Sequence, residues 1–250
     1  MNTNPIFTKL AKQQENEIFK EQASYRGVII KTITLFGVLL LSSLSSLFLI
    51  GLSSTIYTTL LIIAMIVGFV AVMVASSSPR RAKVWSFIYS ICEGFTIGFI
   101  TLLFALSFPD FNIVGLAMLI TLGIFSGMLV LYMTNLIKVT NRFRKVMFGV
   151  SLGILFTMLF VGIVSIFDSG ATWYLLFGDP MSPIVLLLSL VFILYGSFML
   201  VLSFDNAKQI VESGASKDYE YMVGLGLIVS TIYIYLQVLR LLAIILSRRD

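Results

Sequence analysis

Seven apolar runs separated by short polar breaks constrain the fold of this chain more than any other feature of its sequence. Each run has about the 20 residues that an α-helix needs to cross the hydrocarbon core of a bilayer. Only 12% of the residues are charged, whereas soluble domains carry about 25%. We therefore predict an all-α, polytopic membrane protein, with spans at 28–50, 55–75, 84–107, 112–134, 146–167, 183–204 and 221–246.

Two parts of this division leave alternatives open. The first break, Gly51-Leu52-Ser53-Ser54, is weak, so a six-span protein with one long or re-entrant segment is the alternative. Residues 1–27 are polar and carry both signs of charge, which indicates a cytoplasmic tail or an interfacial helix. We expect a single transmembrane domain to follow at residues 28–250.

Basic residues lie on alternate connections between the spans, and this asymmetry predicts the orientation in the membrane. The connections between them contain acids only, at Asp110, Asp168 and Asp179. By the positive-inside rule, the N-terminus is cytoplasmic. We expect the protein to lie in the plasma membrane. Seven spans then place Arg248 and Arg249 outside. The basic residues of the inner connections are Arg80, Arg81, Lys83, Lys138, Arg142, Arg144, Lys145, Lys208 and Lys217.

The residue types present argue against several classes of function. The chain has no histidine, a single cysteine at Cys92, no phosphate-binding glycine loop and no paired acids at metal-ligand spacing on one segment. We therefore predict neither an enzyme nor a bound cofactor. The net charge of +5 does not indicate nucleic-acid binding, because the basic residues flank apolar spans.

Two carboxylates inside or beside the spans are candidates for function. Glu93 lies about ten residues into the third span, ~15 Å deep at 1.5 Å per residue and near the bilayer centre. It either hydrogen-bonds to a neighbouring helix or belongs to an ion or proton path, and the cost of a mid-membrane acid favours the path. Asp205 ends the sixth span on the cytoplasmic side, where it is either solvated or paired with Lys208.

The last span also carries polar residues. Gln237 and Arg240 are three residues apart and share a helix face, with Arg240 able to reach the outer surface. Ser230 and Thr231 are expected to bond to carbonyls of their own helix. Three pairs of glycines one turn apart predict close helix packing, namely Gly94/Gly98, Gly123/Gly127 and Gly149/Gly153.

Several motifs in the chain resemble one known family. The segment from Phe204-Asp205 to Ile210, the motif Asp218-Tyr219-Glu220-Tyr221 and the run from Gly224 to Leu242 resemble the end of the Bax inhibitor-1 family. The bacterial YccA-like branch is the most similar, because Asn4-Pro5-Ile6-Phe7 resembles its start and Glu93-Gly94 with Gly98 resembles its third-span motif. The specific part of the resemblance is the last 45 residues or so.

The resemblance implies a seven-helix bundle whose last helix is central and wrapped by the other six. It also implies a pH-sensitive Ca²⁺ leak, held closed by two hydrogen-bonded aspartates on the sixth and seventh helices. Asp205 matches the first aspartate, and the position of the second falls at Ser230, Thr231 or Gln237. A hairpin turning near Gly214 places Ser230 or Thr231, rather than Gln237, at the depth of Asp205.

Two functions from different classes follow from these observations. The first is a passive Ca²⁺ leak with Asp205 as the gate and the cytoplasmic-side Ca²⁺ contact, and with Glu93 as a mid-pore acid. Ca²⁺ is then the permeant ion rather than a cofactor, and the lipid bilayer is the surrounding partner. The second is a non-transporting regulator that binds other membrane proteins, such as a quality-control protease.

Overall fold

A computed structural model describes residues 21–48, 54–179 and 181–248, and these residues contain seven long helices. All seven are long and apolar enough to cross a membrane, which confirms seven spans rather than six. The motif at Asn4 and most of the predicted tail lie outside the described residues. The long helices are α2 (Tyr25–Phe48), α3 (Ser54–Ser77), α4 (Pro79–Ser107), α5 (Ile113–Met133), α6 (Asn141–Phe167), α8 (Pro183–Glu212) and α9 (Tyr219–Ser247).

Local sequence explains where several of these helices begin. Thr140 caps α6 by accepting a hydrogen bond from the Phe143 amide at 3.2 Å. Ser182 caps α8, and Pro183 takes the first helical position, where its missing N–H is not needed. Between α6 and α8 the chain forms a short helix, α7 (Ala171–Trp173), and a π-helical turn, η1 (Tyr174–Gly178).

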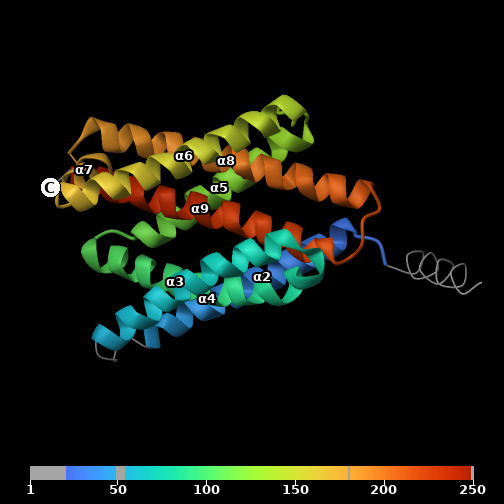
Figure 1. The fold of residues 1–250 in the computed structure, drawn as a ribbon, viewed down its shortest axis with the longest axis horizontal. Helices are drawn as coiled ribbons and strands as arrows, with labels where there is room; N and C mark the ends of the chain where they lie inside the picture. Colours follow the sequence, from blue (N-terminus) through green and yellow to red (C-terminus); the bar gives the residue numbers. More distant parts are fainter. Residues whose placement is uncertain (1–20, 49–53, 180, 249–250) are drawn as a thin grey trace, which may run out of the picture.

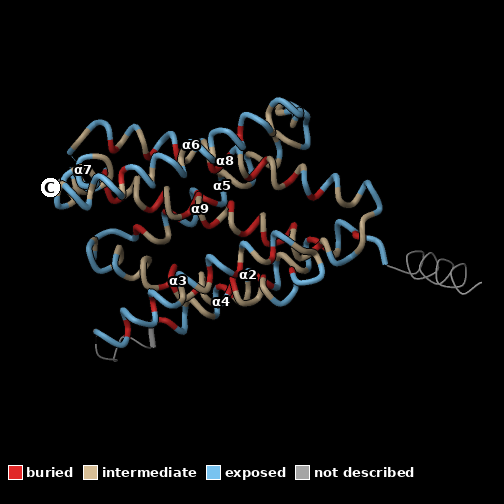
Figure 2. Tube along the Cα trace, viewed as in Figure 1, coloured by how far each residue is buried: buried red, intermediate tan, exposed pale blue. Residues whose placement is uncertain are grey.

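Helix α9 lies at the centre of the bundle, as the family resemblance implies. It packs against α2, α3, α4, α5 and α8, and it is the most buried of the seven spans (Figures 1 and 2). Helix α6 differs from the expectation, because it packs on α7 and α8 and not on α9. The last helix is therefore wrapped by five of the other six spans, and α6 is the most exposed span.

The glycines of α4 allow its close packing on α2. A Cβ atom at Gly94 would lie 2.9 Å from the Ser42 Cβ, and one at Gly98 would collide with the Ser43 carbonyl. Ser42 also donates a hydrogen bond to the Ile91 carbonyl at 2.6 Å. Close packing is thus confirmed for this pair of glycines. The prediction of close packing is wrong for the other two pairs of glycines, since nothing lies within 4 Å of a Cβ built at Gly123, Gly127, Gly149 or Gly153.

The two ends of the bundle differ in charge. The start of α2 lies at the same end as the α3–α4, α5–α6 and α8–α9 connections, and the C-terminus lies at the other end (Figure 1). The first end, called the basic end below, carries the alternate lysine and arginine residues of the sequence. The opposite end carries Asp110, Asp168 and Asp179.

The glycine contacts predict a difference between two matched substitutions. Gly98→Leu should destabilise the protein by about 1–3 kcal/mol, because the new side chain must displace the backbone of α2. Gly127→Leu places the same side chain in open space and should leave stability near that of the wild type. Melting temperatures in detergent measure both, and equal values for the two variants would contradict the α2–α4 contact.

Candidate functional site

Asp205 lies at the basic end and is held by side chains from three helices. Its Oδ1 atom accepts a hydrogen bond from the Tyr132 hydroxyl of α5 at 3.1 Å. Its Oδ2 atom forms an ion pair with Arg144 of α6 and accepts from the Gln209 amide, one turn further along α8, at 2.9 Å. The Asp205 side chain is 13% exposed, so Arg144 offsets most of a charge that water reaches poorly.

Packing around this cluster fixes the positions of the two contributing helices. Tyr132 stacks on Phe204 with ring centroids 6.1 Å apart, which holds the end of α5 against α8. Arg144 lies in the first turn of α6 and also donates to the Asn206 amide oxygen at 2.7 Å. One guanidinium therefore binds two consecutive residues of α8, as its fixed fork of donors allows.

The structure gives Asp205 different partners from those expected on α9. The Ser230 hydroxyl lies 3.0 Å from the Ser203 hydroxyl and donates to the Gly226 carbonyl. Thr231 donates to the Leu227 carbonyl, so the expected back-bonding of both hydroxyls is confirmed. At 3.6 residues per turn, Ser203 and Asp205 point about 200° apart around α8. The residue of α9 that faces Ser203 therefore cannot also pair with Asp205.

A cavity of about 540 Å³ lies beside this cluster, between α3, α8 and α9. Ser230 and Ser203 lie in its wall, and Gln209 links it to the Asp205 carboxylate. Its polar lining consists of neutral oxygen and nitrogen groups, from Ser76, Ser203, Asn206, Gln209, Tyr219 and Ser230. Such groups can coordinate a hard cation weakly, through hydroxyl and amide oxygens.

Glu93 is placed away from both Asp205 and α9. A Cβ atom built at Gly68 of α3 would lie 3.8 Å from the Glu93 Oε2 atom, so the carboxylate faces the α3–α4 junction. No hydrogen bond or ion pair joins it to another residue in the described part of the chain. The structure therefore does not bring the two acids of the predicted ion path together.

Gln237 and Arg240 lie toward the end opposite to Asp205. The Arg240 guanidinium donates to the Phe177 carbonyl of η1 at 2.9 Å and lies 5.2 Å from the Phe177 ring centroid. The Gln237 Oε1 atom is buried and accepts no hydrogen bond from the described residues. Arg240 thus fixes the connection between α6 and α8 to α9, a contact that the sequence alone did not indicate.

The model of the family described as Bax inhibitor 1 like matches residues 4–247 of the chain. The chain belongs to this family. Neither the curated proteins nor the solved structures contain a match. The central α9 is the feature that the family resemblance implied. In this Bax inhibitor-1-like protein, Asp205 pairs with Arg144 of α6 and not with a residue of α9.

A second ionic contact of this Bax inhibitor-1-like protein joins its first and last spans. Glu220 is 0% exposed, and its Oε2 atom lies 2.5 Å from the Lys31 ammonium of α2. Its Oε1 atom accepts from the Ser24 amide at 2.9 Å. Gly27 permits this approach, because a Cβ atom there would collide with the carboxylate. Two features of the sequence could have indicated this contact, namely an acid at the start of the last span and a lysine in the first turns of the first span.

The segment before α2 pairs with the α8–α9 connection next to this contact. The Ala23 amide donates to the Ala215 carbonyl, and the Lys217 amide donates to the Glu21 carbonyl, each at 2.8 Å. The Lys217 ammonium bonds to the Glu21 carboxylate, which lowers the pKa of Glu21 and raises the pKa of Lys217.

The sign of these two shifts determines when the Glu21–Lys217 pair stabilises the fold. Because the pKa of the Glu21 carboxylate is lowered, its contribution stabilises the fold above about pH 4.3 and is lost as the pH falls through the lowered pKa. Because the pKa of the Lys217 ammonium is raised, its contribution stabilises the fold below about pH 10.4 and is lost as the pH rises through the raised pKa. The pair therefore makes a constant contribution between pH 6 and pH 8.

The Asp205 cluster predicts unequal effects of two arginine substitutions in the same turn of α6. Arg144→Gln should lower the free energy of unfolding by about 1.5–3 kcal/mol, the usual range for a hydrogen bond to a charged group. Arg142→Gln removes an exposed arginine from that turn and should change stability by less than about 0.5 kcal/mol. Thermal unfolding in detergent measures the difference, and equal losses would show that the ion pair does not stabilise the bundle.

Proposed function

We propose that this protein is a passive Ca²⁺ leak whose closed state depends on the Asp205–Arg144 pair. The observation that supports this proposal is the position of Asp205, where α5, α6 and α8 meet beside a cavity with several polar groups in its lining. Releasing Asp205 from Arg144 frees its Oδ2 atom from the guanidinium, next to the Asn206 and Gln209 amides that line that cavity. Carboxylate, hydroxyl and amide oxygens are the ligands that Ca²⁺ prefers.

The closed state is accounted for by the packing of α9. Leu225 and Ile228, which lie on the central helix at the level of the cavity, are each 1% exposed. A hydrated cation cannot pass such a packed apolar layer without losing its water. Opening therefore requires α8 to move relative to α9, and the cluster that ties α8 to α5 and α6 opposes that movement.

The arginine gives Asp205 an attractive partner in place of the repulsive one implied by two aspartates. Two adjacent carboxylates repel each other once both are ionised, so raising the pH opens a gate of that kind. A guanidinium stays protonated at every pH of interest, so it attracts the Asp205 carboxylate where a second carboxylate would repel it. The Asp205–Arg144 pair should therefore favour the closed state. The Glu21–Lys217 pair does not contribute to any change between pH 6 and pH 8.

Ca²⁺ flux into liposomes containing the purified protein tests the proposal. The wild type should show slow flux at pH 7. Arg144→Gln and Asp205→Asn should both be fast at pH 7, because each removes the ion pair. Arg142→Gln, the matched control, should behave like the wild type. Arg144→Asp creates two adjacent carboxylates and should make the flux increase with pH.

Three results would count against the proposal. Arg144→Gln and Asp205→Asn variants that are no faster than the wild type contradict an Asp205–Arg144 gate, and a pH response unchanged in Asp205→Asn directs attention to Glu93. The absence of flux from the wild type and every variant contradicts a leak. A membrane protein that co-purifies in that case would favour the non-transporting regulator.

The proposed orientation places the basic end, with the N-terminus, in the cytoplasm of a plasma-membrane protein. In a Cys92→Ser background, Ser169→Cys should react with an impermeant thiol reagent added to intact cells. Ser78→Cys should react only after the cells are permeabilised. Ser78 precedes α4 and Ser169 follows α6, so the three spans α4, α5 and α6 separate the two positions. Labelling of both from the same side would contradict the orientation.

A further inference from the structure

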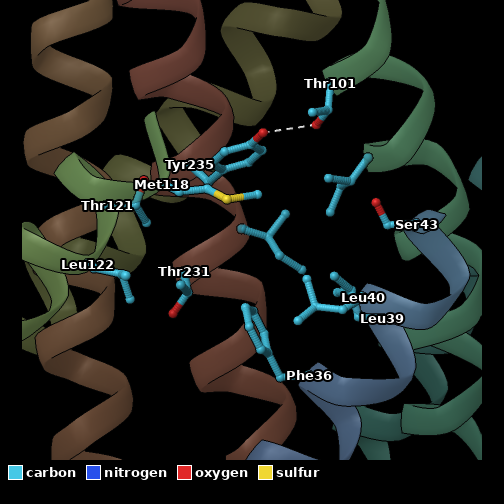
Figure 3. Close-up of a pocket in the computed structure, with 12 residues that line it drawn as sticks. Phe36, Leu39, Leu40, Ser43, Thr101, Met118, Thr121, Leu122, Thr231 and Tyr235 are labelled. Carbon is cyan, nitrogen blue, oxygen red and sulfur yellow. Dashed lines mark hydrogen bonds between the residues drawn. The ribbon is translucent and has the colours of Figure 1, made fainter. Parts of the chain in front are cut away.

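A second opening in the bundle lies between α2 and α5, on a different face of α9 from the polar cavity. Within the described residues these two helices do not contact each other, and α9 forms the floor between them. Helix α4 closes the back of the opening. The result is a groove of about 240 Å³, drawn in Figure 3 and called the α2–α5 groove below.

The mouth of the groove faces the surroundings of the bundle, whereas its base is buried. Phe36 and Leu40 of α2 and Met118 and Leu122 of α5 form the mouth, and all four side chains are exposed. The base contains Leu39, Ile97 and Ile232, which are 3%, 6% and 5% exposed. A molecule that reaches these three residues must enter between α2 and α5.

The polar groups in the groove lining are already bonded within the protein. The Tyr235 and Thr101 hydroxyls hydrogen-bond to each other at 2.9 Å, as Figure 3 shows. Thr121 donates to the Ala117 carbonyl at 2.7 Å, and Thr231 donates to the Leu227 carbonyl at 2.8 Å. Four of the five lining hydroxyls are therefore occupied, and the groove offers an ion or a lipid headgroup almost nothing to bind.

The depth of the groove limits what can enter it. Phe36 is eleven residues from the start of α2, or ~17 Å along the helix at 1.5 Å per residue. The hydrocarbon core is about 30 Å thick, so the mouth opens near the bilayer centre, where the surroundings are lipid chains. Apolar cavities of about 150 Å³ stay free of water and bind hydrocarbons.

We propose that an acyl chain of a membrane phospholipid occupies the α2–α5 groove and packs on α9 at Ile232 and Tyr235. The chain fills the space that α2 and α5 leave open, and it supplies the apolar contacts that the floor of the groove otherwise lacks. This site does not depend on ion movement. The Asp205 cluster lies toward the basic end, beyond the reach of the groove.

Photolabelling tests this site directly. The full chain is placed in nanodiscs that hold one copy each, with phosphatidylcholine carrying a diazirine in the middle of one acyl chain. After irradiation, mass spectrometry should find label on Leu39, Ile97 and Ile232. Ile234, which is 0% exposed and lies two residues from Ile232 outside the groove, is the matched control and should carry none. Absence of label from the three base residues, or equal label on Ile234, would overturn the proposal.

Two variants that fill the groove provide an independent check. Thr231→Phe, from the floor, and Thr121→Phe, from α5, each place a ring where the chain would lie. Either should lower labelling of Ile97 at least tenfold while leaving labelling of the lipid-exposed Phe69 on α3 unchanged. If one variant does not fold, the other and the wild-type comparison still decide. Unchanged labelling of Ile97 in a folded variant would overturn the proposal, because its label would then not come through the groove.

Discussion

The Glu220–Lys31 contact ties the first span of this protein to the last, and much of the bundle depends on it. A carboxylate with no exposed surface is tolerated only when its charge is offset and its oxygens are bonded. Lys31 supplies the charge, and the Ser24 amide supplies a donor. Lys31 lies in α2 and Ser24 immediately precedes that helix, so the start of α2 must lie against the first turn of α9. The same segment then pairs with the α8–α9 connection, which fixes the hairpin that leads to Asp205.

The remaining charges near the spans follow the same constraint. Arg144 and Asp205 join α6 to α8, and Arg240 joins α9 to the Phe177 carbonyl. Each contact joins residues more than 60 positions apart in the sequence, and each lies toward one end of the bundle. Between the ends, α9 packs through apolar side chains, and the spaces beside it differ in chemistry. The space near the basic end has several polar groups in its lining, and the groove near the bilayer centre is almost wholly apolar.

The number and position of the spans were predictable from the sequence, because hydrophobic length is a one-dimensional property. The close packing at Gly94 and Gly98 followed from a motif, but the same motif failed in α5 and α6, whose glycines face open space. Spacing alone does not show which side of a helix meets a neighbour. Helix α6 illustrates this, since its apolar sequence predicts a span and says nothing of its place at the edge.

The partners of Asp205 show the same limit at the candidate site. Reasoning from depth placed Ser230 or Thr231 near Asp205. In the structure, Ser230 of α9 faces Ser203, which lies two residues before Asp205 on α8. Depth fixes the level along α8 but not the direction around it, and two residues turn the helix by about 200°. Arg144 was identified in the sequence only as a topology signal, because it is 61 positions from Asp205 and nothing in the sequence indicates their contact.

The ties between α6 and α8 explain why a single arginine can have a large effect at this site. Besides Arg144, they include the edge-to-face contact of Phe143 with Phe198 and the hydrogen bond between Ser151 and Tyr195 at 2.8 Å. All three residues of α6 lie in its first eleven positions, on the side of the basic end. Because α6 packs on α7 and α8 and not on α9, these contacts and the α7 connection help to position it. Arg144 therefore both pairs with Asp205 and holds the start of α6 against α8. Loss of its charge weakens both contacts.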